Sequence, residues 1–411
     1  MLIKRKIFPK LKNELKNDKI VALVGSRQVG KTTLMKAIKN QTKNSEYITF
    51  DDTEALDLFE HNIKLFIEKY VTKNKFLFID EFQYAKNGGK NLKYIYDTEK
   101  CKLFISGSSS PELTINSLQY LVGRVKIINI HPLTFEEFLE YKETTKTIFL
   151  KSTRTQELDN LKNYFYEYLK TGGYPGIVTS TNKVEDLKNL VRTYLFKEIK
   201  DVLACKNIHE YEHLMKRLSI QDGSLLNKSN ISNDLDINRK KIDELINILA
   251  NTFILKIVRP FYKNKSKEII KSPKIYFQDL GFKNSLLNNF NDLNIREDKG
   301  AILENFILAQ FTRHDFELNF WNWKNIHEMD FVFEKNSKII GIEVKSKLKS
   351  SKLNTSMKKF IEEQKPSKIF IFNENIQDNF IYKKTQIQFL NHMQVYQAIE
   401  ELNKNEEPYN L

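Results

Sequence analysis

The stretch VALVGSRQVGKTTLMKAI, residues 21–38, matches the pattern G-x-x-x-x-G-K-[ST] with Gly25, Gly30, Lys31 and Thr32. An apolar run precedes the glycines and a helical pattern follows them, as a phosphate-binding loop requires. Glycines let backbone N–H groups turn towards a phosphate, and the first turn of the following helix adds partial positive charge. The stretch therefore predicts an α/β domain in which Lys31 reaches the β- and γ-phosphates of ATP and Thr32 holds Mg²⁺.

Two later apolar runs end in polar residues that suit the same site. KFLFIDE, residues 75–81, ends in Asp80, which we expect to hold Mg²⁺, and in Glu81, which we expect to orient or deprotonate the attacking water. LFISGSSSPEL, residues 103–113, brings Ser108 to the end of a third run, where it can face the γ-phosphate. The residues predicted to bind nucleotide are Gly25, Ser26, Gly30, Lys31, Thr32, Thr33 and Asp80, with Lys31, Glu81 and Ser108 assisting catalysis.

Arg124, in LVGRV at 121–125, has two interpretations. It is either an arginine finger, which stabilises charge on the transferring phosphoryl group, or a surface or packing arginine. Because an isolated arginine has no spacing constraint, the sequence leaves both open.

The chain divides into four regions by pattern. Strand-like and helical runs alternate over residues 20–145, which favours a parallel sheet covered by helices. Residues 146–220 have a helical pattern interrupted by TGGYPG at 171–176, a turn signal. Residues 221–290 predict two helices, a turn between them and a following strand pair, and residues 291–411 return to mixed helix and strand. We therefore expect an α/β protein with regions 1–145, 146–220, 221–290 and 291–411.

The third region carries basic residues at the start of its second helix. Asn238 can cap that helix, and the first turn holds Arg239, Lys240 and Lys241. Such residues suit phosphate contacts in a DNA major groove, although cations at a helix N-terminus oppose its dipole. A helix pair used for packing or protein contacts is equally open. The apolar face predicted for this helix is Ile242, Leu245, Ile246 and Leu249.

MDFVFEKNSKIIGIEVKSK, residues 329–347, reads as a hairpin with a short turn. A two-residue turn at 336–337 pairs residue 335 with residue 338, so Asp330 faces Glu343 and Glu328 faces Lys345. Two carboxylates opposite each other repel. A raised pKa, a cationic side chain or a divalent metal must therefore compensate.

These carboxylates offer a candidate metal site. Mg²⁺ prefers one or two carboxylates plus water and phosphate oxygens, which Asp330 and Glu343 suit, and Lys345 beside them can stabilise charge on a phosphate. Glu304, in the helical stretch 299–311, is a candidate third acid. The alternative is a structural remnant in which Glu328 and Lys345 form a cross-strand ion pair and a lysine neutralises Asp330.

Taken in order, these motifs resemble the AAA+-type P-loop ATPases common in archaea and bacteria. The resemblance rests on the phosphate-binding loop, FLFIDE, SGSSS and GRV, then on HPLTFEEFLEY at 131–141, TGGYPG, and KIYFQDLGF at 274–282. It implies a helical lid-like region, a winged-helix segment and a domain similar to PD-(D/E)XK nucleases after the ATPase domain. It also implies Ser108 as a sensor and Arg124 as a finger acting on a neighbouring subunit's nucleotide.

The hairpin and the preceding helix resemble the PD-(D/E)XK core. The resemblance implies Glu304, Asp330 and Glu343 as metal ligands and Lys345 as the catalytic lysine. The sequence departs from the pattern in having no proline before Asp330.

Composition favours a cytoplasmic protein with anionic partners. The formal net charge is +14, which suits nucleic acid, with a generally basic surface as the alternative. Only Cys101 and Cys205 occur, so we expect no disulfide framework, and no apolar run approaches the roughly 18 residues of a membrane span. Three functions are open: an ATPase that couples turnover to nucleic-acid binding or processing, in a homo-oligomer if Arg124 acts between subunits; a nucleotide-gated scaffold whose inactive nuclease-like domain contacts a protein partner; and an ATP-dependent DNA nuclease in defence or repair.

Overall fold

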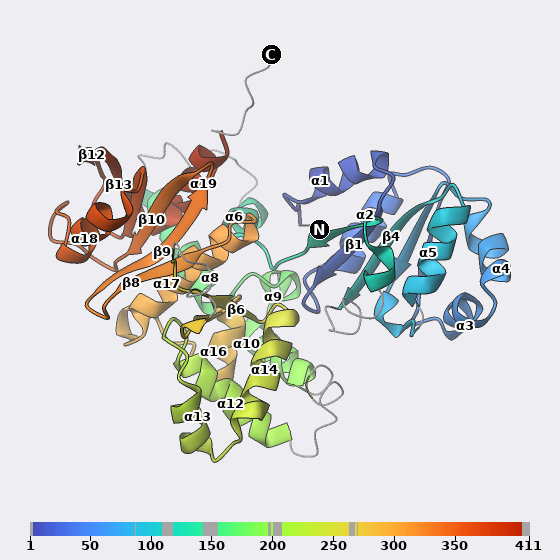
Figure 1. Ribbon diagram of the computed structural model, residues 1–411, viewed down its shortest axis with the longest axis horizontal. Coiled ribbons are helices and arrows are strands. Elements are labelled where there is room, and N and C mark those ends of the chain that lie inside the picture. The colour runs from blue at the N-terminus through green and yellow to red at the C-terminus, as the bar shows by residue number, and fades with distance from the viewer. Residues whose placement is uncertain are drawn as a thin grey trace.

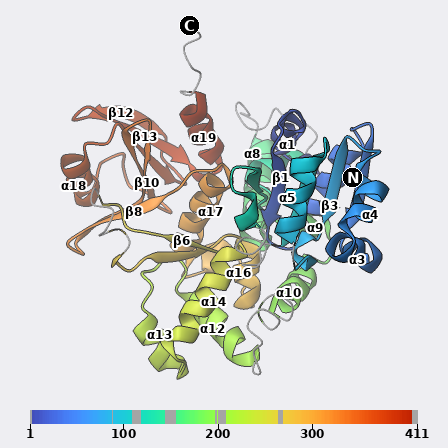
Figure 2. The ribbon, with the colours of Figure 1, turned by 45° about the vertical axis from the view of Figure 1, so that its right-hand side comes forward.

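The computed structural model describes residues 3–86, 88–108, 118–142, 155–195, 199, 208–262, 268 and 270–404. Figures 1 and 2 show two sheets on opposite sides of the molecule, with the helices of the middle region between and below them. Within the described residues, no helix combines the length and the apolar character needed to cross a membrane.

The N-terminal sheet has five strands in the order β2-β3-β4-β1-β5, and each neighbouring pair is parallel. The α/β prediction is confirmed here, because the strand-like runs of residues 20–145 form five parallel strands with helices between them. β1 has a neighbour on both sides, so the loop after it leaves from the interior of the sheet. The strands are β1 Ile20–Gly25, β2 Ser45–Thr49, β3 Phe76–Asp80, β4 Lys102–Ser108 and β5 Val125–Asn129.

Alternating side chains along β1 build a core on each face of this sheet. Val21 and Leu23 pack with α1 and α2, whereas Ala22 and Val24 pack on the face covered by α3, α4 and α5. The phosphate-binding loop therefore lies between a strand and a helix that are both anchored by buried side chains. The helical segments are α1 Phe8–Asn13, η1 Glu14–Lys16, α2 Lys31–Lys39, α3 Thr53–His61, α4 Ile63–Phe66, η2 Ile67–Val71, η3 Phe82–Tyr84, α5 Gly88–Thr98 and η5 Leu118–Leu121.

The middle of the chain contains the predicted helix pair followed by two strands. α13 and α14 precede the antiparallel pair β6 Leu255–Val258 and β7 Lys274–Phe277. Asn238 caps α14 by accepting the Lys240 N–H at 2.8 Å, and the predicted apolar face of α14 is buried. The helices are α6 Phe135–Lys142, α8 Thr155–Thr171, α9 Pro175–Thr179, α10 Lys183–Tyr194, α12 Ile208–Ile220, α13 Lys228–Leu235, α14 Arg239–Asn251 and α16 Leu280–Leu286.

The C-terminal sheet has six strands in the order β12-β13-β11-β10-β9-β8. The predicted hairpin is its β9–β10 pair, in which Lys335 faces Lys338 and Phe331 faces Ile342, so the predicted register is confirmed. α17 packs against β10 and α19 on one side of this sheet. The elements are η7 Leu293–Ile295, α17 Lys299–Arg313, β8 Asn319–Trp323, β9 His327–Lys335, β10 Lys338–Val344, α18 Thr355–Gln364, β11 Lys368–Asn373, β12 Asp378–Tyr382, β13 Thr385–Asn391, η8 His392–Gln394 and α19 Val395–Lys404.

Candidate functional site

The phosphate-binding loop joins β1 to α2, and both of its glycines are required by the backbone. A Cβ on Gly25 would lie 2.2 Å from the Ile130 carbonyl oxygen, and Gly30 has a φ of +96°. Lys31, the first residue of α2, is buried, and its Nζ lies 2.8 Å from the Gly25 oxygen and 2.9 Å from the Ser26 oxygen. The ammonium group is thus directed at the loop in which we expect a phosphate.

Two residues from distant parts of the chain hold this loop. Arg5 donates from Nη1 to the Val29 oxygen at 2.8 Å and from Nη2 to the His131 oxygen at 2.7 Å. The Tyr174 hydroxyl, in TGGYPG, lies 3.2 Å from Ser26 Oγ. Sequence reasoning missed both roles, because no spacing relates these residues to the loop. The conformation of the loop is therefore tied to the N-terminal segment and to TGGYPG.

Asp80 is buried at the carboxyl-terminal end of β3, the same end of the sheet at which β1 enters the loop. Its Oδ2 accepts the Tyr47 hydroxyl at 2.7 Å, and its Oδ1 accepts the hydroxyl of Ser106. Burial and the hydrogen bond to this carboxylate raise the pKa of Tyr47, so Tyr47 remains a donor. Ser106 is a further residue that sequence reasoning missed. Ser108 ends β4 with its backbone paired to Gly25, and its side chain lies outside what the structure describes.

Glu81 follows Asp80 in an unusual backbone conformation. Its φ is +53°, in the left-handed region that residues other than glycine seldom adopt. Its carboxylate accepts a hydrogen bond from the Gln83 side chain. Conformations of this kind are concentrated at functional sites, and the role of Glu81 in activating water stays a prediction.

An apolar pocket of about 530 Å³ lies beside the loop. Gly30 and Thr33 line it on the loop side, and Phe8, Leu34 and Pro175 line it from α1, α2 and α9. Pockets of this size and character suit small ligands with an apolar ring. The pocket therefore adjoins the loop in which we expect phosphates.

Arg124 lies at the amino-terminal end of the strands, whereas the phosphate-binding loop lies at their carboxyl-terminal end. It precedes β5, whose first residue Val125 pairs with Ile20 at the start of β1, whereas the loop follows Gly25. At about 3.3 Å per residue, the two ends of β1 are roughly 17 Å apart. Its Nε lies 2.8 Å from Asp97 Oδ1 at the surface. Arg124 cannot reach a nucleotide on its own loop, so a finger towards another subunit and a surface ion pair are the two readings left.

The predicted carboxylate pair lies on neighbouring strands of the second sheet. One residue beyond the last pair of the β9–β10 ladder, Asp330 and Glu343 stand opposite each other. The Val344 N–H donates to Asp330 Oδ2 at 2.7 Å. Lys345 Nζ lies 2.7 Å from Glu343 Oε1 and 3.9 Å from Asp330 Oδ2. Glu343 Oε2 is buried without a hydrogen-bond partner among the described residues.

The electrostatics of this pair favour a cation. Burial and the charge of Asp330 raise the pKa of Glu343 to about 8, and burial also raises the pKa of Asp330. Burial opposes the charge on Lys345, yet the two carboxylates raise its pKa. Two buried carboxylates with one unpartnered oxygen fit a hard cation with oxygen ligands.

Glu304 is held by β7. Its Oε1 accepts the Tyr276 hydroxyl and lies 3.5 Å from Lys274 Nζ, and Lys274 also lies 2.5 Å from Glu328 Oε1. The alternative ion pair between Glu328 and Lys345 is therefore wrong, because Glu328 pairs with Lys274. Burial and the charge of Asp330 raise the pKa of Glu304 to about 7. In the described parts of the chain, no group of three or more His, Cys, Asp or Glu side chains is placed to hold a metal ion.

TGGYPG and KIYFQDLGF, two motifs far apart in the sequence, pack directly together. The Gly173 N–H donates to Asp279 Oδ2 at 2.8 Å. A Cβ on Gly172 would lie 1.9 Å from Asp279 Oδ1, and one on Gly281 would lie 2.1 Å from the Thr171 oxygen. KIYFQDLGF thus begins at Lys274, which contacts Glu304 and Glu328, and ends at the loop that carries Tyr174.

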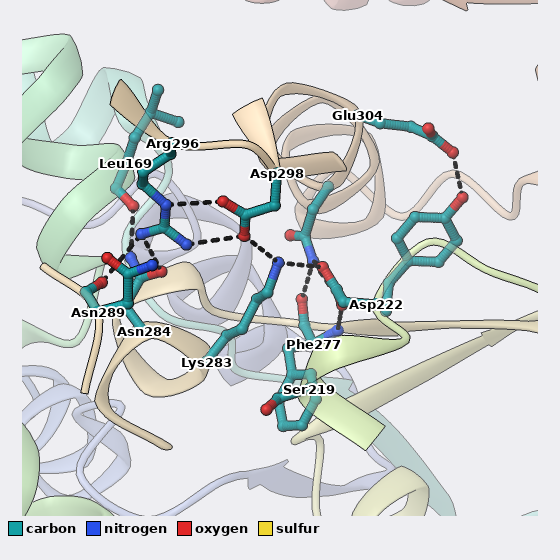
Figure 3. A network of polar contacts seen from close by, with 12 residues as sticks. Leu169, Ser219, Asp222, Phe277, Lys283, Asn284, Asn289, Arg296, Asp298 and Glu304 are labelled. Carbon is teal, nitrogen blue, oxygen red and sulfur yellow. Dashed lines mark hydrogen bonds and ion pairs between the residues drawn. The ribbon is translucent and has the colours of Figure 1, made fainter. Parts of the chain in front are cut away.

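A buried polar network holds α17 to α16 (Figure 3). Lys283 Nζ lies 3.2 Å from Asp222 Oδ2 and 3.3 Å from Asp298 Oδ2. Arg296 donates from Nε and Nη2 to Asp298, each at 2.8 Å. Buried charges are tolerated only when each has a partner. The network therefore fixes the start of α17, the helix that carries Glu304.

Comparison with known proteins agrees with the N-terminal geometry. Residues 17–139 match the family model described as an AAA domain, which agrees with the P-loop NTPase-like sheet and loop. Residues 162–293 and 299–395 match two domains of unknown function, DUF8612 and DUF4143.

The chain is similar to two uncharacterised proteins of Methanocaldococcus jannaschii. One is 28% identical over 79% of this chain and 74% of its own, and the other is 23% identical over 93% and 86%. Among solved structures, the chain is similar to the ORC2 protein of Aeropyrum pernix in its ADP form, which is 11% identical over 67% of this chain and 90% of that chain, with a TM-score of 0.33.

Proposed function

We propose that the protein binds and hydrolyses ATP and that turnover is coupled to the binding or processing of nucleic acid. One observation carries the proposal: a glycine loop leaves an interior parallel strand with buried Lys31 directed into it and Asp80 at the same sheet edge. The match to an AAA domain over residues 17–139 supports the ATPase part. The four regions 1–145, 146–220, 221–290 and 291–411 are our proposed domains.

The residues at this end of the sheet then have the following roles in the proposed complex with ATP. Lys31 leaves the loop carbonyls and binds the β- and γ-phosphates, while the apolar pocket takes the base. Asp80, oriented by its two hydroxyl donors, and Thr32 would hold Mg²⁺, which when bound neutralises charge on the phosphates. Glu81 orients the attacking water and accepts its proton, and Ser108 contacts the γ-phosphate.

Support for a nucleic-acid partner comes from charge and from α14. The formal net charge is +14. Arg239 and Lys240 are exposed in the first turn of α14, with Lys240 Nζ 4.0 Å from Glu244 Oε1, and Lys241 pairs more closely with Glu210, at 2.9 Å. The order of two helices and an antiparallel strand pair supports our proposal of a winged helix, in which the start of the second helix meets a phosphate backbone.

Equilibrium binding of a fluorescent ATP analogue tests the nucleotide site. We expect Lys31→Ala to lose more than tenfold in affinity, because charge-assisted hydrogen bonds contribute about 1.5–3 kcal/mol each. Tyr174→Phe removes one hydroxyl contact to the loop, so we expect a loss of roughly fivefold in affinity, equivalent to about 1 kcal/mol. Wild-type affinity in Lys31→Ala would end the assignment of the loop.

ATP hydrolysis with and without duplex DNA, single-stranded DNA or RNA tests the coupling. We expect nucleic acid to change the rate in wild type and to lose this effect in the double variant Arg239→Glu/Lys240→Glu. Lys64→Glu/Lys73→Glu is the matched control, with the same change of charge at exposed residues elsewhere. If nucleic acid leaves the wild-type rate unchanged, the function moves to a nucleotide-gated scaffold for a protein partner.

A second candidate function is metal-dependent cleavage of nucleic acid. It is favoured by the buried pair of Glu343 and Asp330. Within the described part of the chain, Glu343 Oε2 is buried and has no hydrogen-bond partner. The pair would hold a divalent cation, which when bound activates water and neutralises phosphate charge, and Lys345 would stabilise the phosphate. We expect wild type to cleave DNA with Mg²⁺ or Mn²⁺ and Glu343→Ala to lose cleavage but keep ATP hydrolysis. Cleavage that survives this substitution would refute the assignment.

A further inference from the structure

We call Glu304, Glu328, Asp330 and Glu343 the carboxylate cluster. This cluster contains a cation, Lys274, that the β9–β10 hairpin does not supply. Lys274 is the first residue of β7, between α14 and α16 in the chain, yet its ammonium lies 2.5 Å from Glu328 Oε1 and 3.5 Å from Glu304 Oε1. Its side chain is 9% exposed, and it also lies over the Phe320 ring at 5.4 Å. Because a buried ammonium is stable only next to its partners, Lys274 is held inside the cluster.

Tyr276 adds a second contact from the same strand. Residues two apart on a strand share a face, so Tyr276 points the same way as Lys274. Its hydroxyl donates to Glu304 Oε1, the oxygen that Lys274 also approaches. β7 therefore holds the Glu304 carboxylate with two donors.

These contacts explain why the three predicted acids are not one ligand set. Asp330 and Glu343 face each other, and Glu343 Oε2 is buried without a hydrogen-bond partner among the described residues. Glu304 is directed to β7 instead, and no three acidic, histidine or cysteine side chains in the described residues are placed to share an ion. Releasing Glu304 from β7 would supply the third carboxylate.

We propose that Lys274 and Tyr276 act as a built-in competitor of a divalent cation. Lys274 neutralises the cluster, and both residues hold Glu304 away from the facing carboxylates, so the ion binds fully only when these contacts are released. The proposal rests on the second candidate function, since it requires Asp330 and Glu343 to bind a cation. The ligand is a hard divalent ion that prefers oxygen donors.

Isothermal titration of the full chain with Mn²⁺, without nucleotide, tests the proposal. We expect Lys274→Met to bind Mn²⁺ at least tenfold more tightly than wild type and Tyr276→Phe about threefold more tightly. The gain should disappear in Lys274→Met/Glu304→Gln, because it requires the released carboxylate. Lys368→Met is the matched control: this lysine on β11 is also 9% exposed and pairs with a glutamate, Glu401 on α19. It should bind Mn²⁺ as wild type does.

The outcomes separate this proposal from the functions it builds on. Mn²⁺ affinity in folded Lys274→Met that equals or falls below wild type would overturn the proposal alone, as would a gain that survives Glu304→Gln. If Lys274→Met does not fold, Tyr276→Phe decides by the same criterion. Absence of Mn²⁺ binding in every variant, or binding unchanged by Glu343→Gln, would overturn the proposal together with the second candidate function. ATP binding by the same samples reports separately on the nucleotide site.

Discussion

Replacing Glu343 with glutamine should stabilise the six-stranded sheet at alkaline pH and have little effect at acid pH. Burial and the neighbouring Asp330 raise the pKa of Glu343 from 4.5 to about 8 in the folded chain. Between these values the folded state keeps a proton that the unfolded state has released. The free energy of unfolding therefore falls as pH rises through this interval, and the full loss is reached above pH 8.

The size of the effect follows from the same two values. One pH unit of difference between the folded and unfolded pKa corresponds to roughly 1.4 kcal/mol. The difference of about 3.5 therefore corresponds to about 5 kcal/mol. Glutamine has nearly the same shape and never ionises, so the variant avoids this loss. We expect Glu343→Gln to raise the free energy of unfolding by about 5 kcal/mol at pH 9 and by about 1 kcal/mol at pH 5.

Tryptophan fluorescence during guanidinium unfolding measures this sheet selectively. Trp321 and Trp323 are the two tryptophans of the chain, and both lie on β8. Glu362→Gln is the control, because this glutamate on α18 is exposed and pairs with Lys383 at 2.9 Å, so its replacement should matter little at either pH. A gain for Glu343→Gln that is the same at pH 5 and pH 9 within about 1 kcal/mol would show that the pKa of Glu343 is not raised in the folded chain.

Two further substitutions test the packing of the motifs and the place of the arginine. Gly172→Ala should lower stability by about 2–4 kcal/mol in thermal unfolding, because φ is +73° and the new Cβ would lie 1.9 Å from Asp279 Oδ1. Gly176→Ala, whose Cβ would meet nothing within 4 Å, should leave stability unchanged or slightly higher, and equal effects of the two would contradict the packing. If Arg124 acts between subunits, Arg124→Ala should lower ATP turnover without changing ATP affinity, and mixing it with Lys31→Ala should restore part of the turnover. No restoration at any mixing ratio would count against a shared site.

Local patterns predicted most of the fold. The five strands of the first sheet followed from apolar runs, and the hairpin register followed from turn length, since both depend on residues close in sequence. The same reasoning placed Asp330 opposite Glu343. It could not exclude an ion pair of Glu328 with Lys345, because the competing lysine lies on a strand more than 50 residues earlier.

The residues that sequence reasoning missed make contacts between distant segments. Arg5 reaches the Val29 carbonyl, Tyr174 reaches Ser26, and Lys274 reaches the cluster on β9 and α17. Each contact depends on how whole elements pack, and nothing in the spacing of residues along the chain encodes it. A signal was present in TGGYPG and KIYFQDLGF, whose glycines are explained by the close approach of the two motifs.

Steady-state ATP hydrolysis by wild type, Lys31→Ala and Lys39→Ala shows whether the lysine of the phosphate-binding loop is needed for turnover. Both lysines lie on α2, but Lys31 is buried with its ammonium in the phosphate-binding loop, whereas Lys39 is in the last turn of the helix. We predict Mg²⁺-dependent hydrolysis by wild type and Lys39→Ala, and none by Lys31→Ala. Hydrolysis by Lys31→Ala at the wild-type rate, or none by purified wild type with or without nucleic acid, would contradict the account.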